Sequence, residues 1–229
     1  MDPIDVGPFG HDLVQVAKDL DSILQQLAPN SEFLLVSNSI GGPLSRIYAA
    51  NNPGRVAGLI FLDFNPAHCQ FQNDVFPDPT SPDFDLESLP SDLTVDDLIE
   101  SREIMYKMFS PSNPNKEGLD RRNLAQFLPS ASEPKLIGPG GKAPYITVVG
   151  HDAGTFAQEG LDRMGISKVV TETYLQPYWE KYNQGLLGIS DREAGNEVKI
   201  AKGCGHVIQL ANPHFVAEEL KAMLQKLGW

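Results

Sequence analysis

The sequence predicts an α/β fold in which a doubly wound, mostly parallel sheet carries an inserted helical lid. Apolar runs typical of buried strands alternate with segments whose apolar residues recur every three or four positions, as in helices that connect parallel strands. Between residues 66 and 141 this alternation stops, and prolines and acidic residues become frequent. We therefore expect a core formed by residues 1–65 and 142–229, with residues 66–141 as the lid.

The first part of the expected core alternates helix, strand, helix and strand. Apolar residues spaced by three and four predict an amphipathic helix over about residues 11–28. An apolar strand is expected at 33–38, and Pro43 suits the first turn of the helix that follows it, where its missing N–H costs no hydrogen bond. Residues 56–63 are almost continuously apolar, which is typical of a parallel strand covered on both faces.

The same patterns predict the remaining elements. In chain order these are lid helices over about 95–109 and 119–127, a strand at 143–150, a helix around 169–184, a strand at 197–201 and a final helix that begins at Asn212-Pro213.

The strand at 33–38 is followed by Ser39, and the small residues Gly41 and Gly42 come before the next helix. A nucleophilic serine needs such a sharp strand-to-helix turn, because its hydroxyl must stand clear of the sheet and its neighbours must be small. The usual pattern is Gly-x-Ser-x-Gly, and here Ser37 takes the place of the first glycine. We predict that Ser39 is a nucleophile; its alternative role is to cap the helix.

A serine hydroxyl becomes reactive when a histidine takes its proton and a carboxylate orients that histidine. His206, on a glycine-flanked loop after the strand at 197–201, is the predicted base. Asp63 and Asp152 each follow a strand, and catalytic groups gather at the carboxyl ends of parallel strands. The sequence leaves both acids open and slightly favours Asp152, although either could serve only a turn or a strand end.

These motifs resemble those of the α/β-hydrolase fold family. Residues 37–42 are similar to the family elbow Gly-His-Ser-x-Gly-Gly, and residues 205–213 resemble its histidine loop and last helix. The resemblance implies an enzyme that needs no cofactor and no metal. It also implies that the backbone N–H of Ile40 helps to bind an oxyanion, with Asn38 beside it at the oxyanion and substrate site.

The resemblance is to an N-terminally truncated member of that family. Its members usually carry three or four strands before the helix that here begins near residue 11, and a loop among those strands supplies the second oxyanion donor. Residues 1–10 are too short to replace them. The strand at 33–38 would then be an exposed apolar edge, so we expect a homodimer that covers it.

The composition of the chain limits the classes of partner that we expect. With 18 basic and 30 acidic residues the chain carries a formal net charge of −12, which disfavours nucleic acid. No apolar run approaches the ~18 residues of a membrane span. The beginning of the chain does not resemble a secretory signal, and Cys69 and Cys204 imply no disulfide framework, so a cytoplasmic location is expected. His68, His151 and His214 lack the spacing of metal ligands and are expected at the surface or in the lid.

The predicted function is therefore that of a serine hydrolase acting on a small-molecule substrate, namely a small apolar ester, lactone or thioester. Two alternatives stay open. One is an enzyme of the same fold that does not hydrolyse its substrate, such as a C–C lyase, dehydratase or cyclase. The other is an inactive binding module, which the absent strands would favour.

Overall fold

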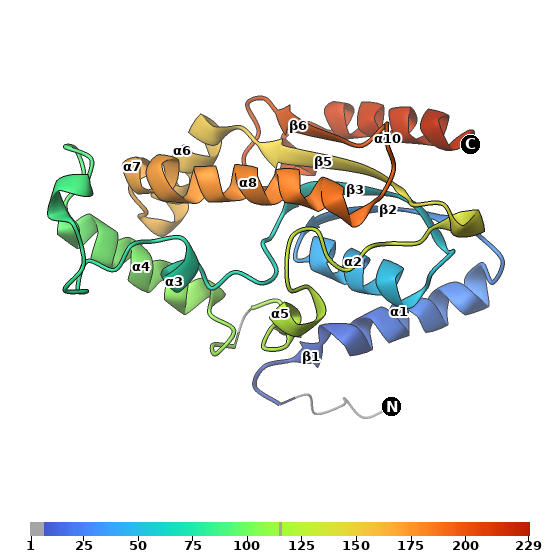
Figure 1. Cartoon of the computed structure of the whole chain (residues 1–229), viewed down its shortest axis with the longest axis horizontal. Coiled ribbons are helices and arrows are strands. Elements are labelled where there is room, and N and C mark those ends of the chain that lie inside the picture. The colour runs from blue at the N-terminus through green and yellow to red at the C-terminus, as the bar shows by residue number, and fades with distance from the viewer. Residues whose placement is uncertain (1–6, 115) are drawn as a thin grey trace.

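The computed structural model of the chain describes residues 7–114 and 116–229. Its main sheet is a four-stranded parallel sheet in the order β2-β3-β5-β6 (Figure 1). The strands are β2 (Phe33–Ser39), β3 (Val56–Phe64), β5 (Tyr145–His151) and β6 (Glu197–Ala201). Each lies close to a strand expected from the sequence, so the predicted α/β class with a parallel sheet is confirmed.

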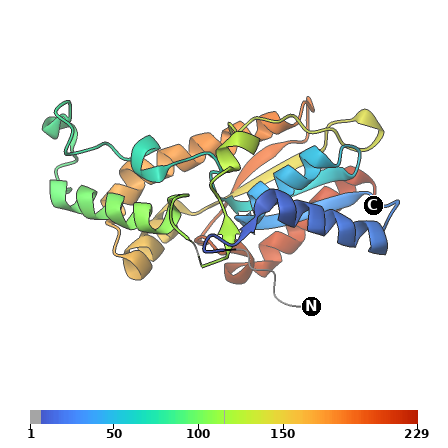
Figure 2. The ribbon, with the colours of Figure 1, turned by 90° about the horizontal axis from the view of Figure 1, so that it is seen from below.

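Helices cover both faces of this sheet (Figures 1 and 2). One face carries α1 (Leu13–Leu27), α2 (Gly41–Asn51) and α8 (Gln176–Leu186), and the other carries α9 (Ile208–Ala211) and α10 (Pro213–Leu227). In β3, Leu59 and Phe61 pack on the first side, whereas Ile60 and Leu62 pack on the second. Every residue of β3 is buried, which explains why its sequence is an apolar run without alternation.

The other described elements lie outside the main sheet. They are β1 (His11–Asp12) and β4 (Leu119–Asp120), which pair in parallel, the helices α3 (Phe71–Asp74), α4 (Val95–Phe109), α5 (Leu124–Phe127), α6 (Ala153–Met164) and α7 (Lys168–Val170), the short helices η1 (Leu86–Ser88), η2 (Pro139–Gly141) and η4 (Leu187–Ile189), and the π-helix η3 (Thr171–Leu175).

Two expectations about the helices need correction. The helix expected over 119–127 is two elements, because residues 119–120 form β4 against β1 and the helical turn begins only at Leu124. The helix expected around 169–184 is a run of α7, η3 and α8. Helix α6 had no counterpart among the expected elements.

Much of the segment 66–141 packs at one end of the molecule, beyond the sheet (Figure 1). Helix α4 begins with a capping box in which Thr94 and Asp97 bond each other's backbone N–H groups. Leu98 and Met105 of α4 are buried in an apolar cluster with Val170 and Trp179. The segment therefore rests on α7 and α8, while its division from the core as a lid stays a prediction.

Strand β2 has a single strand neighbour in the part of the chain that the structure describes, and Val36 on it is 43% exposed. An unpaired strand edge with an exposed apolar side chain is a site where another chain can pair. Over the described residues, none of the helices combines the length and apolar character that a membrane crossing requires.

Candidate active site

The elbow that the sequence predicts is present as a sharp turn from β2 into α2. Ser39 is the last residue of β2, and Gly41 begins α2 two residues later. Among the described residues, Ser39 (φ 53°) and Asp63 (φ 44°) are the two non-glycine residues with positive φ. Such a left-handed conformation is costly for residues with a side chain and recurs at functional sites.

Gly42 lets the elbow approach the neighbouring strand. A Cβ atom at position 42 would lie 2.3 Å from Cδ2 of Phe64, the residue after Asp63. The Phe64 side chain is fully buried. At Gly41 the nearest atom to such a Cβ is the Cβ of Ser37, at 3.4 Å. The packing against Phe64 therefore requires glycine at position 42, whereas a Cβ atom at position 41 would make only an ordinary contact.

We expect Gly42→Ala to lower the free energy of unfolding by about 1–3 kcal/mol, because the added methyl group must displace a ring in a full core. Urea denaturation measures this change. Gly41→Ala is the matched control and should cost clearly less. Equal losses in the two variants would show that the Phe64 contact is not what requires a glycine.

Asp63 contacts His206 at the end of β3. The pairing of β2 with β3 shifts register between Asn38 and Ser39, so that Ser39 pairs with Phe64 and Asp63 is passed over. Such a bulge re-aims a side chain, and Oδ2 of Asp63 lies 2.5 Å from Nδ1 of His206. Because Asp63 occupies Nδ1, the other ring nitrogen of His206 is left for a substrate or a nucleophile.

The charge on Asp63 is held by these contacts. The Asp63 side chain is fully buried, which by itself would raise the pKa of its carboxyl group. Hydrogen bonds from His151 and His206 outweigh the burial and lower that pKa below its ordinary value. The Asp63 carboxylate is thus ionised at neutral pH.

Ser39 and His206 line the same cavity, which has a volume of about 680 Å³. Most of its walls are apolar and come from helices α4 and α6, from the segment between α6 and α7, and from the run of η3 and α8. They include Met105, Phe109, Phe156, Ile166, Leu175 and Trp179. Charged side chains on its lining include Lys107, Arg121, Arg163 and Glu159. The arrangement places a hydroxyl and an imidazole on the lining of a mostly apolar cavity, with the buried Asp63 carboxylate in contact with the imidazole.

Asp152, the acid that the sequence slightly favours, caps helix α6 in the structure. Its Oδ1 accepts hydrogen bonds of 3.1 Å from both the backbone N–H and the hydroxyl of Thr155, so it caps the N-terminus of α6. The preference for Asp152 is therefore corrected, since Asp63 is the carboxylate in contact with His206. A helix cap and a triad acid can both lie at the end of a strand, so the positions of Asp63 and Asp152 in the sequence did not distinguish the two roles.

Asn38 joins the elbow to the histidine loop. Its Nδ2 donates to the carbonyl oxygens of Leu62 (2.8 Å) and His206 (3.0 Å), and its Oδ1 accepts from Gln209 (3.3 Å). These contacts occupy the amide within the protein and favour a positioning role over the expected contact with substrate. Ile40, whose N–H was expected at the oxyanion, directly follows Ser39 and lines a small adjoining cavity.

We expect Asn38→Ala to reduce ester hydrolysis about tenfold and the free energy of unfolding by about 1–3 kcal/mol, because two backbone carbonyls lose their donor. Gln209→Ala removes only the longest of the three bonds and serves as the control. Kinetics and urea denaturation of both variants test this. An Asn38→Ala enzyme with higher KM, unchanged kcat and unchanged stability would point back to substrate contact.

His151 was expected at the surface or in the lid, and this expectation is wrong. It is the last residue of β5 and only 2% exposed. Its Nδ1 lies 2.7 Å from Oδ1 of Asp63, and its Nε2 lies 2.7 Å from Oε1 of Gln176. Asp63 therefore holds two histidines, one on each oxygen. The signal in the sequence was the position of His151 at the carboxyl end of a strand.

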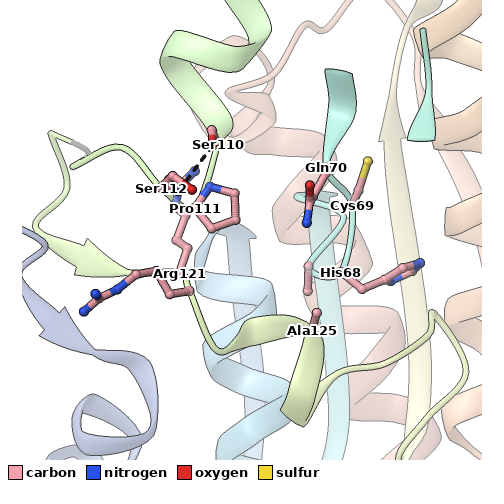
Figure 3. Close-up of a pocket in the computed structure, with 10 residues that line it drawn as sticks. His68, Cys69, Gln70, Ser110, Pro111, Ser112, Arg121 and Ala125 are labelled. Atoms are coloured by element: carbon pink, nitrogen blue, oxygen red, sulfur yellow. Dashed lines mark hydrogen bonds between the residues drawn. The ribbon is translucent and has the colours of Figure 1, made fainter. Parts of the chain in front are cut away.

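A second cavity, of about 250 Å³, is lined by His68, Cys69, Gln70 and Arg121 among others (Figure 3). The Arg121 guanidinium points away from His68 (Figure 3). It pairs with Glu117 at 2.5 Å. Burial raises the pKa of the Cys69 thiol to about 12, so this cysteine is not a thiolate. Within residues 7–114 and 116–229, no group of three or more His, Cys, Asp or Glu residues is placed to hold a metal ion.

No family model and no curated protein matches the sequence. Among solved structures, Est816, described as an N-acyl homoserine lactone degrading enzyme, is similar with a TM-score of 0.46 and 17% identity, over 95% of this chain and 76% of that one. A carboxylesterase structure from the ammonia-oxidising thaumarchaeon Nitrososphaera gargenis has a TM-score of 0.43 and 15% identity, over 95% and 74% of the two chains. The crystal structure of VinJ is similar with a TM-score of 0.43 and 17% identity, over 93% of this chain and 73% of that one. The chain is thus similar, at a low level of sequence identity, to solved structures of a lactone-degrading enzyme and a carboxylesterase.

Proposed function

We propose that the protein is a serine hydrolase that cleaves the ester, lactone or thioester bond of an apolar acyl compound. The observation that carries the proposal is the contact between Asp63 and His206 at a cavity that Ser39 also lines. The left-handed backbone of Ser39 adds support, because it is the conformation that a nucleophile on a strand-to-helix turn requires.

In the proposed reaction, Oγ of Ser39 attacks the carbonyl carbon while Nε2 of His206 takes the hydroxyl proton. The N–H of Ile40 donates to the oxyanion that forms. His206 then gives the proton to the leaving alcohol or thiol, and an acyl group remains on Ser39. A water molecule, activated by His206, releases the acid and restores the serine. Asp63 holds His206 in the tautomer that leaves Nε2 able to accept a proton.

The cavity suggests the acyl part of the substrate. Its volume of about 680 Å³ and its Met, Phe, Leu, Ile and Trp side chains suit a flexible apolar chain better than a charged one. Helix α4, from the segment 66–141, contributes one wall, so we propose that this segment acts as a lid that selects the substrate.

A fluorophosphonate probe tests the nucleophile. We expect covalent labelling of a single peptide that contains Ser39, and its loss in Ser39→Ala and in His206→Ala. Ser37→Ala is the matched control, because Ser37 lies two residues away on the same strand and its Oγ is buried without a partner among the described residues. Labelling that survives in Ser39→Ala would refute the proposal.

A panel of p-nitrophenyl esters tests the substrate class. We expect kcat/KM to rise as the acyl chain lengthens from two to about eight carbons, because each buried methylene contributes about 0.8 kcal/mol. A preference for acetate over every longer ester would contradict an acyl-binding role for the cavity.

We also propose that two copies pair through the free edge of β2. Val36 is exposed, and β2 has a single strand neighbour within residues 7–114 and 116–229; both observations support this pairing. Size-exclusion chromatography with light scattering should give twice the 25.1 kDa mass of the chain. A monomer at micromolar concentration would exclude the pairing.

A further inference from the structure

The contacts of His151 define the direction of each hydrogen bond around it. An ionised Asp63 can only accept, so the 2.7 Å contact between its Oδ1 and His151 Nδ1 requires a proton on Nδ1. On the other side of the ring, His151 Nε2 faces Oε1 of Gln176 at 2.7 Å. An amide oxygen also only accepts, so this contact requires a proton on Nε2 as well.

The orientation of the Gln176 amide decides the second of these contacts. Its Nε2 donates to Oε1 of Glu180 at 3.0 Å. Turning the amide over would place its oxygen against the Glu180 carboxylate, where two acceptors would repel each other. Glu180 therefore fixes the amide with its oxygen toward His151, and the chain of bonds runs from an exposed carboxylate to a buried one.

The rings around His151 favour a positive charge. Phe156 stacks on it face to face, with ring centroids 3.8 Å apart and planes 8° apart, and Trp179 meets it at 5.6 Å. The face of an aromatic ring attracts a cation. The charged groups that act on it are Asp63 from β3 and Glu180 from α8, both negative, and His206 contacts the other oxygen of Asp63.

We propose that His151 is a positioning residue that stays an imidazolium while the enzyme works, sharing the Asp63 carboxylate with His206. Burial alone would lower the pKa of His151, but Asp63, Gln176 and Glu180 together raise it above its ordinary value. Each oxygen of Asp63 is assigned to one histidine, so the carboxylate cannot rotate away from His206. This role rests on the proposed function, whereas the charge state of His151 can be measured independently of it.

The charge has a predictable effect on the pH range of the reaction. A carboxylate that already holds one cation stabilises a second proton on His206 less than a free carboxylate would. Removing the His151 charge should move the acid limb of the pH–rate profile toward neutral pH.

The charge state is tested by ¹⁵N NMR of the histidine-labelled protein, which distinguishes an imidazolium from either neutral tautomer. We expect both nitrogens of His151 to be protonated at pH 7.5. Glu180→Gln should lower the midpoint of the His151 titration by about one pH unit, because the amide can then turn over. Glu172→Gln, an exposed glutamate on η3 with the same charge change, should leave it in place. A His151 nitrogen without a proton at pH 7.5 in the parent would overturn the proposal, whether or not the protein hydrolyses esters.

The effect on catalysis is tested by kcat/KM against pH for His151→Gln and Glu180→Gln. We expect the acid limb to rise by about one pH unit in His151→Gln and by less in Glu180→Gln, with rates that approach the parent at high pH. Glu180 is exposed, so its variant keeps the test valid if His151→Gln does not fold. An unchanged acid limb in a folded variant whose His151 charge is absent would refute the positioning role.

Discussion

Ser39→Ala is expected to lower kcat for ester hydrolysis on the order of 10⁴-fold or more, because the residual rate must come from water attack in the same cavity. Serine and alanine both carry a Cβ, so the left-handed backbone at position 39 is equally costly in the two proteins. The fold should therefore be unchanged, and the loss should report the chemistry alone.

Steady-state kinetics and the affinity for a non-hydrolysable apolar ligand separate these effects. We expect the Ser39→Ala protein to bind the ligand as tightly as the parent, since the walls of the cavity are untouched. Ser37→Ala should retain the parent rate. A Ser39→Ala enzyme within tenfold of the parent would remove Ser39 from the mechanism.

Asp63→Asn is expected to lower kcat by about 10⁴-fold near neutral pH. An asparagine presents an NH₂ group to one of its two histidines. If it faces His206, the ring must accept at Nδ1 and carry its proton on Nε2, where it cannot take a proton from Ser39. If it faces His151, that ring must give up its Nδ1 proton, and His206 keeps its tautomer but loses the negative charge that stabilises its protonated form. The first arrangement removes the base, and the second weakens it.

Asp152→Asn is the matched control for Asp63→Asn. Asparagine caps a helix as well as aspartate does, so α6 should keep its N-terminus and kcat should stay within a few-fold of the parent. Kinetics at pH 7 compare the two variants directly. A large loss in Asp152→Asn with a small one in Asp63→Asn would reverse the assignment of the acid.

The sequence predicted what depends on short segments of chain. The elbow at Ser39 is a local pattern of an apolar strand, a serine and two glycines, and all four strands of the main sheet were found from short patterns, three of them apolar runs and the fourth the alternating residues 197–201. The glycine-flanked loop likewise singled out His206. Each of these patterns spans fewer than ten residues, so none of them depends on which distant segments of the chain pack against it.

The rest depends on contacts between distant segments. Asp63 could not be separated from Asp152, because the choice rests on a register shift between β2 and β3. His151 was misjudged, since its position at the end of a strand does not show which side chains face it, and its partners lie on β3 and α8. Strand β4 was taken as helix because it pairs with β1, more than a hundred residues earlier in the chain.

Ser39 and Asp63 both have positive φ angles, a backbone conformation that costs free energy in residues with a side chain. Glycine would relax both positions and would also remove the hydroxyl and the carboxylate. Laboratory evolution for heat resistance alone would therefore be drawn to the codon of Ser39, whereas Asp63 is retained by its bonds to His151 and His206. Only selection that scores product formation together with melting temperature would keep the hydroxyl at position 39.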